Sequence, residues 1–265
     1  NKPFQIDTYF ANYPAHAIEL TKQLLTEKPD MIVACGGDGT INEVAQSMLN
    51  QSIPLGIIPI GSGNGLSSNL NIPKNITLAL EGLIMNQPKM IDVGQINDRF
   101  FFSNTGFGID AQVIHRYTAQ KKRNFMGYLK ATIWTFFNYK PLKYKLKFED
   151  ESVESNQYFF VLCSNSNEAG YGISFTPNAQ LNDGKFDIVC IEKLNFLKML
   201  KFGYCVITNR LNRMEEVFSK QVSALEIVSN KTPIIAQIDG EAVELDENVV
   251  KLNIIPNALR VIAPN

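Results

Sequence analysis

Two short apolar runs near the start of the chain each end in a glycine-rich turn, and each turn leads directly into a helical pattern. The run "IVACG" at 32–36 precedes "GDGTINEVAQ", whose apolar residues recur at helical spacing. The run "PLGIIPIG" at 54–61 precedes "SGNGLSSNL". Repeated strand–turn–helix units predict a parallel sheet, and the carboxyl ends of parallel strands meet at one edge of that sheet. We therefore expect the two glycine turns to face one ligand.

The alternation of strand and helix signals extends over residues 1–91, which predicts an α/β domain with helices flanking a parallel sheet. Besides the two runs above, the pattern predicts a strand at 4–10 and helices at 15–27, 40–50 and 76–85.

From residue 92 to residue 265 the pattern changes to short strand-like runs between turn-rich segments, which predicts a β-sandwich domain. Two helical segments, at 121–140 and 195–211, interrupt it. The predicted strands of this second domain are 99–108, 142–148, 157–164, 186–192, 224–229, 234–239 and 249–255.

Charge and cysteine content restrict the class of function and the compartment. The 265 residues carry 25 basic and 26 acidic side chains, so nothing in the net charge of −1 favours a nucleic-acid partner. The four cysteines lie in apolar runs without the spacing of a metal site, which favours buried free thiols in a reducing compartment. No apolar run reaches the roughly 20 residues of a membrane span, and no signal peptide is recognisable. These features predict a cytoplasmic protein.

The two glycine turns have the composition of a phosphate-binding site. Glycines allow backbone N–H groups to approach phosphate oxygens, and the helix that follows offers its positive N-terminal end. A tight turn in which Asp38 caps the helix is the alternative for the first of them. Neither turn matches the Walker A pattern, and the protein-kinase signatures are absent. The candidate phosphate-binding residues are Gly36, Gly37, Asp38, Gly39, Thr40, Asn42, Gly61, Ser62, Gly63 and Asn64.

Four segments in order resemble the diacylglycerol kinase catalytic family, which includes bacterial lipid kinases and the sphingosine and ceramide kinases. These segments are "CGGDGTINEV", "PIGSGN", "NDGKFDI" and "IDGEAVE". The resemblance implies a nucleotide-binding α/β domain followed by a β-sandwich, and ATP-dependent, Mg²⁺-dependent phosphorylation of a lipid hydroxyl. The family usually carries an N-P-x-S-G segment after a first strand. That segment is not found here, and we expect that residues are missing upstream.

The same resemblance implies roles for single residues. Glu241 matches the general base that accepts the proton of the lipid hydroxyl. Asp38 is the competing base, because the matching loop aspartate has that role in the sphingosine kinases, although we favour a magnesium or nucleotide contact for it. Asp110 matches an aspartate that contacts the acceptor's head group, and an N-cap is its alternative. Thr8 matches a threonine that touches the nucleotide.

The segment "NAQLNDGKFDI" has the composition of a hairpin turn. By resemblance to the bacterial members, Asp183 would help to hold a structural Mg²⁺ together with the backbone carbonyls of Gln180 and Lys185. Oxygen ligands with retained waters suit that ion.

A basic and aromatic segment at 120–148 offers a way to reach a lipid substrate in a membrane. Its cations include Lys121, Lys122 and Arg123, and aromatic residues are interleaved among them. Such a helix can lie in the interface of an anionic membrane, which predicts peripheral contact with the inner membrane face. A domain-packing helix with its aromatic residues in the core is the alternative.

Two other functions remain open from the sequence. NAD kinases share the "GGDGT" segment and the two-domain plan, but "GSGN" and "DGE" here are closer to the lipid kinases. A non-catalytic protein that binds a nucleotide or a lipid is the second alternative. The sequence also leaves open which lipid is the acceptor and whether the chain forms a homodimer.

Overall fold

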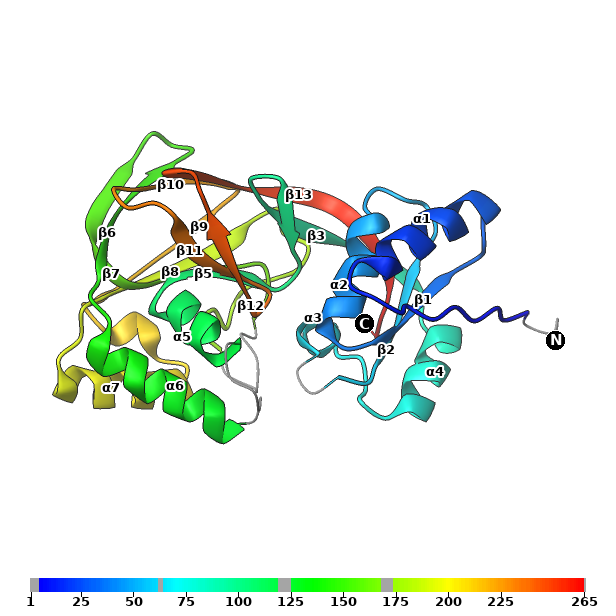
Figure 1. The fold of residues 1–265 in the computed structure, drawn as a ribbon, viewed down its shortest axis with the longest axis horizontal. Coiled ribbons are helices and arrows are strands. Elements are labelled where there is room, and N and C mark those ends of the chain that lie inside the picture. The colour runs from blue at the N-terminus through cyan, green and yellow to red at the C-terminus, as the bar shows by residue number, and fades with distance from the viewer. Residues whose placement is uncertain (1–4, 62–63, 119–124, 168–173, 265) are drawn as a thin grey trace. The chain divides into compact units, whose positions relative to one another are not determined.

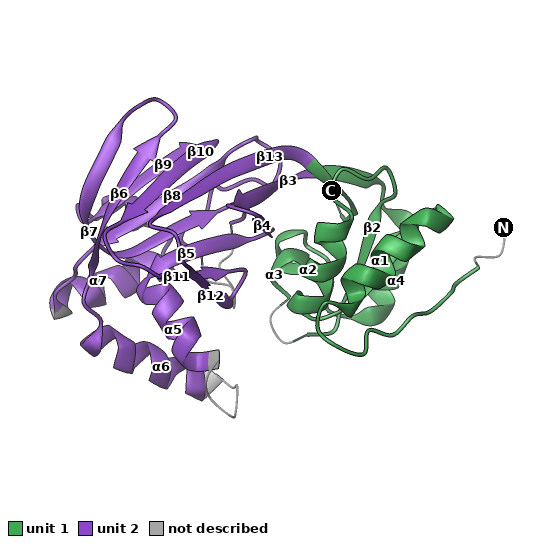
Figure 2. Ribbon diagram, turned by 45° about the horizontal axis from the view of Figure 1, so that its top comes forward, with its two compact units in different colours: residues 1–90, 258–265 green, residues 91–257 purple. Residues whose placement is uncertain are grey.

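The computed structural model describes residues 5–61, 64–118, 125–167 and 174–264. The chain forms two compact units, shown in separate colours in Figure 2: residues 1–90 with 258–265, and residues 91–257. Residues 258–265 belong to unit 1 and follow unit 2 through the last strand, and the domain boundary between residues 91 and 92 stays a prediction.

Unit 1 contains short parallel strands with helices packed against them (Figure 1). Strand β1 pairs with β2 in parallel from Ile32↔Leu55 to Gly36↔Pro59, and the end of β13 adds a parallel pair at Val261↔Leu55. Helix α2 packs against β1 and α4 against β2, as the sequence predicted. The helices and strands that lie wholly within unit 1 are α1 (His16–Glu27), β1 (Ile32–Gly36), α2 (Asp38–Ser47), β2 (Leu55–Pro59), α3 (Gly65–Asn69) and α4 (Ile76–Met85).

The strand predicted at 4–10 is wrong for the residues that the structure describes. Residues 5–10 have no regular structure, and Ile6 and Phe10 are 80% and 75% exposed. Alternating apolar residues form a strand only where a neighbour pairs with the backbone N–H and C=O groups. The sequence pattern carries no information about that neighbour.

Unit 2 is built mainly from antiparallel strands (Figure 1). Two long strands, β3 (Pro88–Ile96) and β13 (Val249–Ile262), connect it to unit 1. Its other strands are β4 (Arg99–Phe101), β5 (Asn104–Gly108), β6 (Leu142–Phe148), β7 (Val153–Ser164), β8 (Phe186–Glu192), β9 (Val217–Val222), β10 (Ala224–Ser229), β11 (Ile234–Ile238) and β12 (Glu241–Leu245). Its helices are α5 (Ile109–Thr118), α6 (Phe125–Asn138), α7 (Phe196–Ile207) and the 3₁₀ helix η1 (Leu211–Arg213).

The main path of the unit 2 sheet runs in the order β13-β10-β6-β7-β5-β11-β12. Strand β8 adds to β7, and β9 adds to β8. The predicted β-rich second domain is confirmed.

The two faces of this sheet bury two different apolar clusters, because side chains alternate along each strand. In β7, Val161 and Cys163 belong to the inner cluster, which also draws on β5, β6, β10, β11 and β13. Phe160 and Leu162 of the same strand belong to the outer cluster, which α6 and α7 cover. The outer cluster thus fixes both helices to one face of the sheet.

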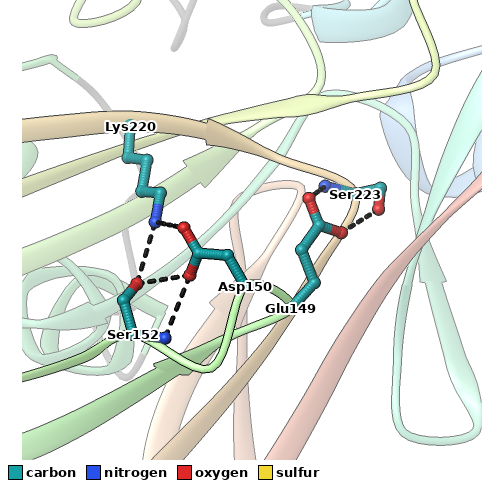
Figure 3. Close-up of polar contacts among 5 residues, drawn as sticks. All are labelled: Glu149, Asp150, Ser152, Lys220 and Ser223. Carbon is teal, nitrogen blue, oxygen red and sulfur yellow. Dashed lines mark hydrogen bonds and ion pairs between the residues drawn. The ribbon is translucent and has the colours of Figure 1, made fainter.

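Polar contacts fasten the β6–β7 hairpin to β9 and to the turn that follows β9 (Figure 3). Lys220 Nζ lies 2.6 Å from Asp150 Oδ2 and 3.0 Å from Ser152 Oγ. The hydrogen bond from Lys220 lowers the pKa of Asp150 to about 2. Glu149 accepts hydrogen bonds from both the hydroxyl and the N–H of Ser223. These contacts are structural.

The cysteines are free thiols, as expected, but the prediction that all are buried is wrong for Cys35. Strand β1 has an alternating burial pattern, and Cys35 shares the exposed face with Val33. Within the described part of the chain, no helix is both long and apolar enough to cross a membrane.

Candidate functional site

The two glycine turns lie against each other in unit 1. The N–H of Ile60, the residue after β2, donates to the carbonyl oxygen of Gly36 across 2.9 Å. A Cβ atom at Gly61 would lie 2.6 Å from Cα of Gly37, so a side chain at this position would force the turns apart. The structure therefore brings together the two turns that the sequence placed at one sheet edge.

Asp38 joins the two turns through its carboxylate. Its oxygens accept the N–H groups of Asn64 at 2.8 Å and Gly65 at 2.6 Å, at the start of α3. The N-cap of α2 is Gly37, with no side-chain cap, so Asp38 does not cap the helix that it begins. Its carboxylate instead satisfies two donors of the other turn.

Asn64 shapes the second turn from within. It is buried and has φ 61°, a conformation that asparagine tolerates better than most residues. Its side chain accepts the N–H of Gly61 at 2.9 Å and donates to the carbonyl oxygen of Gly61 at 2.6 Å. Of the predicted phosphate-binding residues, Ser62 and Gly63 lie outside the described residues.

The remaining candidates of the first turn begin α2. Gly39 and Thr40 lie in the first turn of this helix, where backbone N–H groups have no partner within the helix, and Asn42 follows in the next turn. This end of α2 together with the glycine backbone fits a polyphosphate. Thr8 lies in the exposed irregular segment, and its contact with a nucleotide stays a prediction.

Replacing Asp38 tests the connection between the turns. In Asp38→Asn an amide NH₂ group would replace one acceptor oxygen. The backbone amides of Asn64 and Gly65 should therefore lose about 1–3 kcal/mol of protection against hydrogen exchange. Native-state hydrogen exchange followed by mass spectrometry over this segment measures the loss. Asp30→Asn, at an exposed position of the same unit, is the matched control. Exchange equal to that of the control would contradict the assignment.

In unit 2, Asp110 of α5 lies directly against β5. A Cβ atom at Gly106 would approach Asp110 Oδ2 to 2.4 Å, so this strand position must be glycine for the carboxyl group to fit. The side chain of Gln237, in β11, hydrogen-bonds Asp110.

Gln237 is the centre of a buried polar network that the sequence analysis missed. Its Nε2 donates to Asn104 Oδ1 at 2.6 Å, and its Oε1 accepts the N–H of Gly240 at 2.7 Å. Gln237 thus connects the acid of α5 to the turn that precedes Glu241. A glutamine inside the otherwise apolar run "IIAQI" was the signal that could have revealed it.

The turn between β11 and β12 positions Glu241. Asp239 and Gly240 have φ values of 47° and 83°, as a two-residue hairpin of type I′ requires. The Asp239 carboxylate accepts the N–H groups of Phe102, Ser103 and Asn104 at 2.8, 2.8 and 3.0 Å. Glu241 follows as the first residue of β12 and is exposed. The turn is therefore anchored, and the carboxylate after it is accessible.

Burial raises the pKa of Asp110 from 3.8 to about 6, against the opposing effect of the hydrogen bond from Gln237. A raised pKa means that ionised Asp110 costs folding free energy above pH 6, and that this cost disappears as the pH falls toward 4.

Asp110→Asn should therefore stabilise unit 2 at neutral pH. An asparagine keeps the shape and an acceptor for Gln237 but carries no charge. We expect a gain of up to about 3 kcal/mol at pH 7.5 that vanishes near pH 4, from 1.36 kcal/mol per pKa unit. Chemical denaturation across this pH range measures it. A gain that does not depend on pH would contradict the raised pKa.

The predicted metal residues lie in the segment before β8. Asp183 is exposed, and its Oδ1 accepts the N–H of Lys185 at 3.0 Å. Burial raises the pKa of the nearby Asp187, and the charge of Asp183 raises it further. Carboxylate oxygens such as those of these two residues suit a hard cation such as Mg²⁺, and the part of the Gln180 and Lys185 carbonyls in such a site stays a prediction. The described residues contain no cluster of three or more His, Cys, Asp or Glu side chains of the kind that holds a metal.

A buried aspartate that was not predicted as a site residue holds this segment in place. Asp92 accepts the N–H of Gly184 at 2.6 Å and that of Asn257 at 2.7 Å, and its own N–H donates to Leu181 at 2.6 Å. The segment 181–184 is thereby fixed to β3 and to the residues of β13 that end unit 2.

Comparison with known proteins identifies the family. Residues 1–96 match the model of the diacylglycerol kinase catalytic domain, and residues 103–263 match that of the YegS C-terminal NAD kinase beta sandwich-like domain. The chain is 30% identical over 245 residues to a "probable lipid kinase YegS-like" of Chromohalobacter salexigens, covering 88% of this chain and 76% of that protein. It is 25% identical over 246 residues to a diacylglycerol kinase of Bacillus subtilis, covering 90% and 80%.

A solved structure described as a diacylglycerol kinase of Bacillus anthracis has the same fold. The TM-score is 0.71 at 18% identity, over 96% of this chain and 83% of that chain. With the matched domain models, these similarities show that the chain belongs to the family of diacylglycerol kinases and YegS-like lipid kinases.

Proposed function

We propose that this protein is an ATP-dependent, Mg²⁺-dependent lipid kinase that phosphorylates a hydroxyl group of a diacylglycerol-like lipid. The observation that carries the proposal is the pair of glycine turns joined by Asp38, in a chain of this family. Membership supports the reaction class, and the residues support the division of roles described below.

Unit 1 would hold the nucleotide. The backbone N–H groups of the first glycine turn, Gly36–Thr40, would bind the phosphate oxygens next to the N-terminal end of α2. The N–H groups of Gly61, Asn64 and Gly65 already have acceptors within the two turns, so the described part of the second turn would support the first. Because both carboxylate oxygens of Asp38 accept backbone N–H groups, we assign it to holding this site in shape. Phosphoryl transfer depends mostly on such positioning and on neutralising charge.

Unit 2 would supply the groups that act on the acceptor. Asp110 would orient the head group of the lipid by a hydrogen bond, and Gln237 would position Asp110. Glu241 would take the proton of the acceptor hydroxyl while the oxygen of that hydroxyl forms a bond to the γ-phosphorus of ATP. The bond between that phosphorus and the β,γ-bridging oxygen then breaks, ADP leaves, and Glu241 returns its proton to solvent.

Magnesium would have two places in this scheme. Bound with the nucleotide, the ion supplies neutralisation of the phosphate charge. Asp183, with the backbone carbonyls of Gln180 and Lys185, would hold a structural ion that fixes the segment before β8. With a membrane lipid as its acceptor, the protein would act at the inner face of a membrane.

A comparison of acceptors tests the proposal. The full-length protein is incubated with radiolabelled ATP and Mg²⁺, and with diacylglycerol, phosphatidylglycerol, a sphingoid base or NAD in parallel. We expect label in a lipid product with at least one lipid and none in NADP. Label in NADP alone would make the protein an NAD kinase, and nucleotide binding without transfer to any acceptor would make it a non-catalytic member.

A further inference from the structure

Helix α6 presents an apolar stripe outward. Met126, Leu129, Ile133 and Phe137 are spaced by three or four residues, so they lie along one face of the helix. Their side chains are between 38% and 72% exposed. Ala131 and Thr135, on the opposite face, are buried. The apolar stripe is therefore exposed to water, and the described residues of unit 2 do not cover it.

Helix α7 presents a second stripe of the same kind, which the sequence analysis did not predict. Leu197, Leu200, Tyr204 and Ile207 have the same helical spacing and are between 58% and 85% exposed. The opposite face packs inward through Cys205, which is buried.

The two stripes belong to one surface of unit 2. Phe136 of α6 and Phe202 of α7 pack against the same outer cluster on the sheet. The ring of Phe136 packs edge-on against that of Phe159, with 5.3 Å between the ring centroids, and the ring of Phe202 stacks on that of Phe175. Both helices therefore cover one face of the sheet, as Figures 1 and 2 show, with their outer sides turned away from it. We call the eight residues of the two stripes the α6/α7 face.

The charged residues that the two helices themselves carry have one sign. Neither helix contains Asp or Glu, and Lys130 and Lys201 are exposed next to the stripes. The acids near α7 lie outside the helix, around Lys198: Glu216, whose side chain is only 14% exposed, pairs with it at 2.5 Å, and the charges of Glu215 and Glu192 also act on it. Apolar residues flanked by lysines match an anionic lipid surface, where the lysines meet phosphates and the apolar side chains enter the acyl boundary.

We propose that the α6/α7 face docks onto an anionic lipid bilayer, an inference that rests on the proposed function as far as the acceptor is a membrane lipid. A second copy of the chain fits less well. A self-complementary contact would oppose lysines to lysines, and neither helix offers an acid to pair with them. The face extends the segment predicted from the sequence, because α7 supplies half of it.

Vesicle co-sedimentation tests the docking. The full-length protein is mixed with vesicles of phosphatidylcholine alone or with phosphatidylglycerol added. Leu197→Ser/Leu200→Ser/Ile207→Ser should reduce binding to anionic vesicles by about tenfold or more, since affinity scales with buried apolar area. The matched control is Ile76→Ser/Leu80→Ser/Ile84→Ser, which removes exposed apolar residues from α4 of unit 1. This control should bind like the unchanged protein.

A charge variant separates the two contributions. Lys130→Glu/Lys201→Glu should lose the preference for anionic over neutral vesicles while it keeps the apolar residues. Undiminished binding by the α7 variant would overturn the proposal. So would an oligomer that the α7 variant dissociates without any change in vesicle binding, since the occupant would then be a second copy.

Activity distinguishes failure of the docking from failure of the proposed function. The α7 variant should phosphorylate diacylglycerol in vesicles poorly but dihexanoylglycerol, dissolved as a monomer, at the rate of the unchanged protein. If the unchanged protein phosphorylated neither, the proposed function would fail while the binding result would still decide the docking. Equal loss on both acceptors would show a structural defect and contradict the docking role.

Discussion

Glu241→Gln is expected to lower kcat for lipid phosphorylation by about 10²- to 10⁴-fold, the range that a general base contributes. Glutamine has nearly the same shape but cannot take a proton at neutral pH. The substitution lies at an exposed strand start, so the free energy of unfolding and the affinity for ATP should not change. Steady-state kinetics together with ATP titration by calorimetry measure the three quantities.

Glu244→Gln is the matched control for this experiment, because it removes an exposed carboxylate from the same strand. It should retain full turnover. If Glu241→Gln kept full turnover too, Glu241 would not be the base, and Asp38 would become the candidate. In that case Asp38→Asn should abolish phosphoryl transfer, in addition to lowering the protection of the Asn64 and Gly65 amides against hydrogen exchange.

Asp239→Ala is expected to destabilise unit 2 by about 2–4 kcal/mol, because three backbone N–H groups lose their acceptor. Turnover should fall as well, since the same carboxylate anchors the turn before Glu241. Chemical denaturation followed by a probe in unit 2 measures the first effect, and kinetics on a soluble acceptor the second.

The left-handed backbone of Asp239 needs its own control. Asn209 has φ 52° and is exposed, so Asn209→Ala carries the conformational cost of alanine in that region without loss of a three-donor acceptor. A destabilisation no larger in Asp239→Ala than in Asn209→Ala would show that the three hydrogen bonds contribute little.

Elements with a strong local pattern could be predicted from the sequence. Strand β6, "LKYKLKF", alternates apolar and basic residues, and Tyr144, Leu146 and Phe148 are buried as the pattern indicates. The matching of β1 and β2, each followed by a glycine turn, predicted that the turns would meet. In such segments the local pattern and the tertiary environment agree.

Other features could not be predicted because they depend on neighbours distant in sequence. Strand β9 was missed, since Ser219, Lys220 and Gln221 dilute its apolar pattern and only its pairing with β8 makes it a strand. The segment at 5–10 has the pattern but no pairing. The position of Gln237 between Asn104 and Asp110 arises from β5, α5 and β11 together. No local spacing encodes such a contact.

The transfer of one phosphoryl group tests the central claim most directly. The full-length protein, Mg²⁺, diacylglycerol and ATP whose γ-phosphate carries heavy oxygen isotopes are combined, and the lipid products are analysed by mass spectrometry. The account predicts a lipid phosphate that carries the heavy isotopes and that forms only when the acceptor is present. Heavy isotopes found solely in inorganic phosphate, at a rate that does not depend on any lipid acceptor, would contradict it.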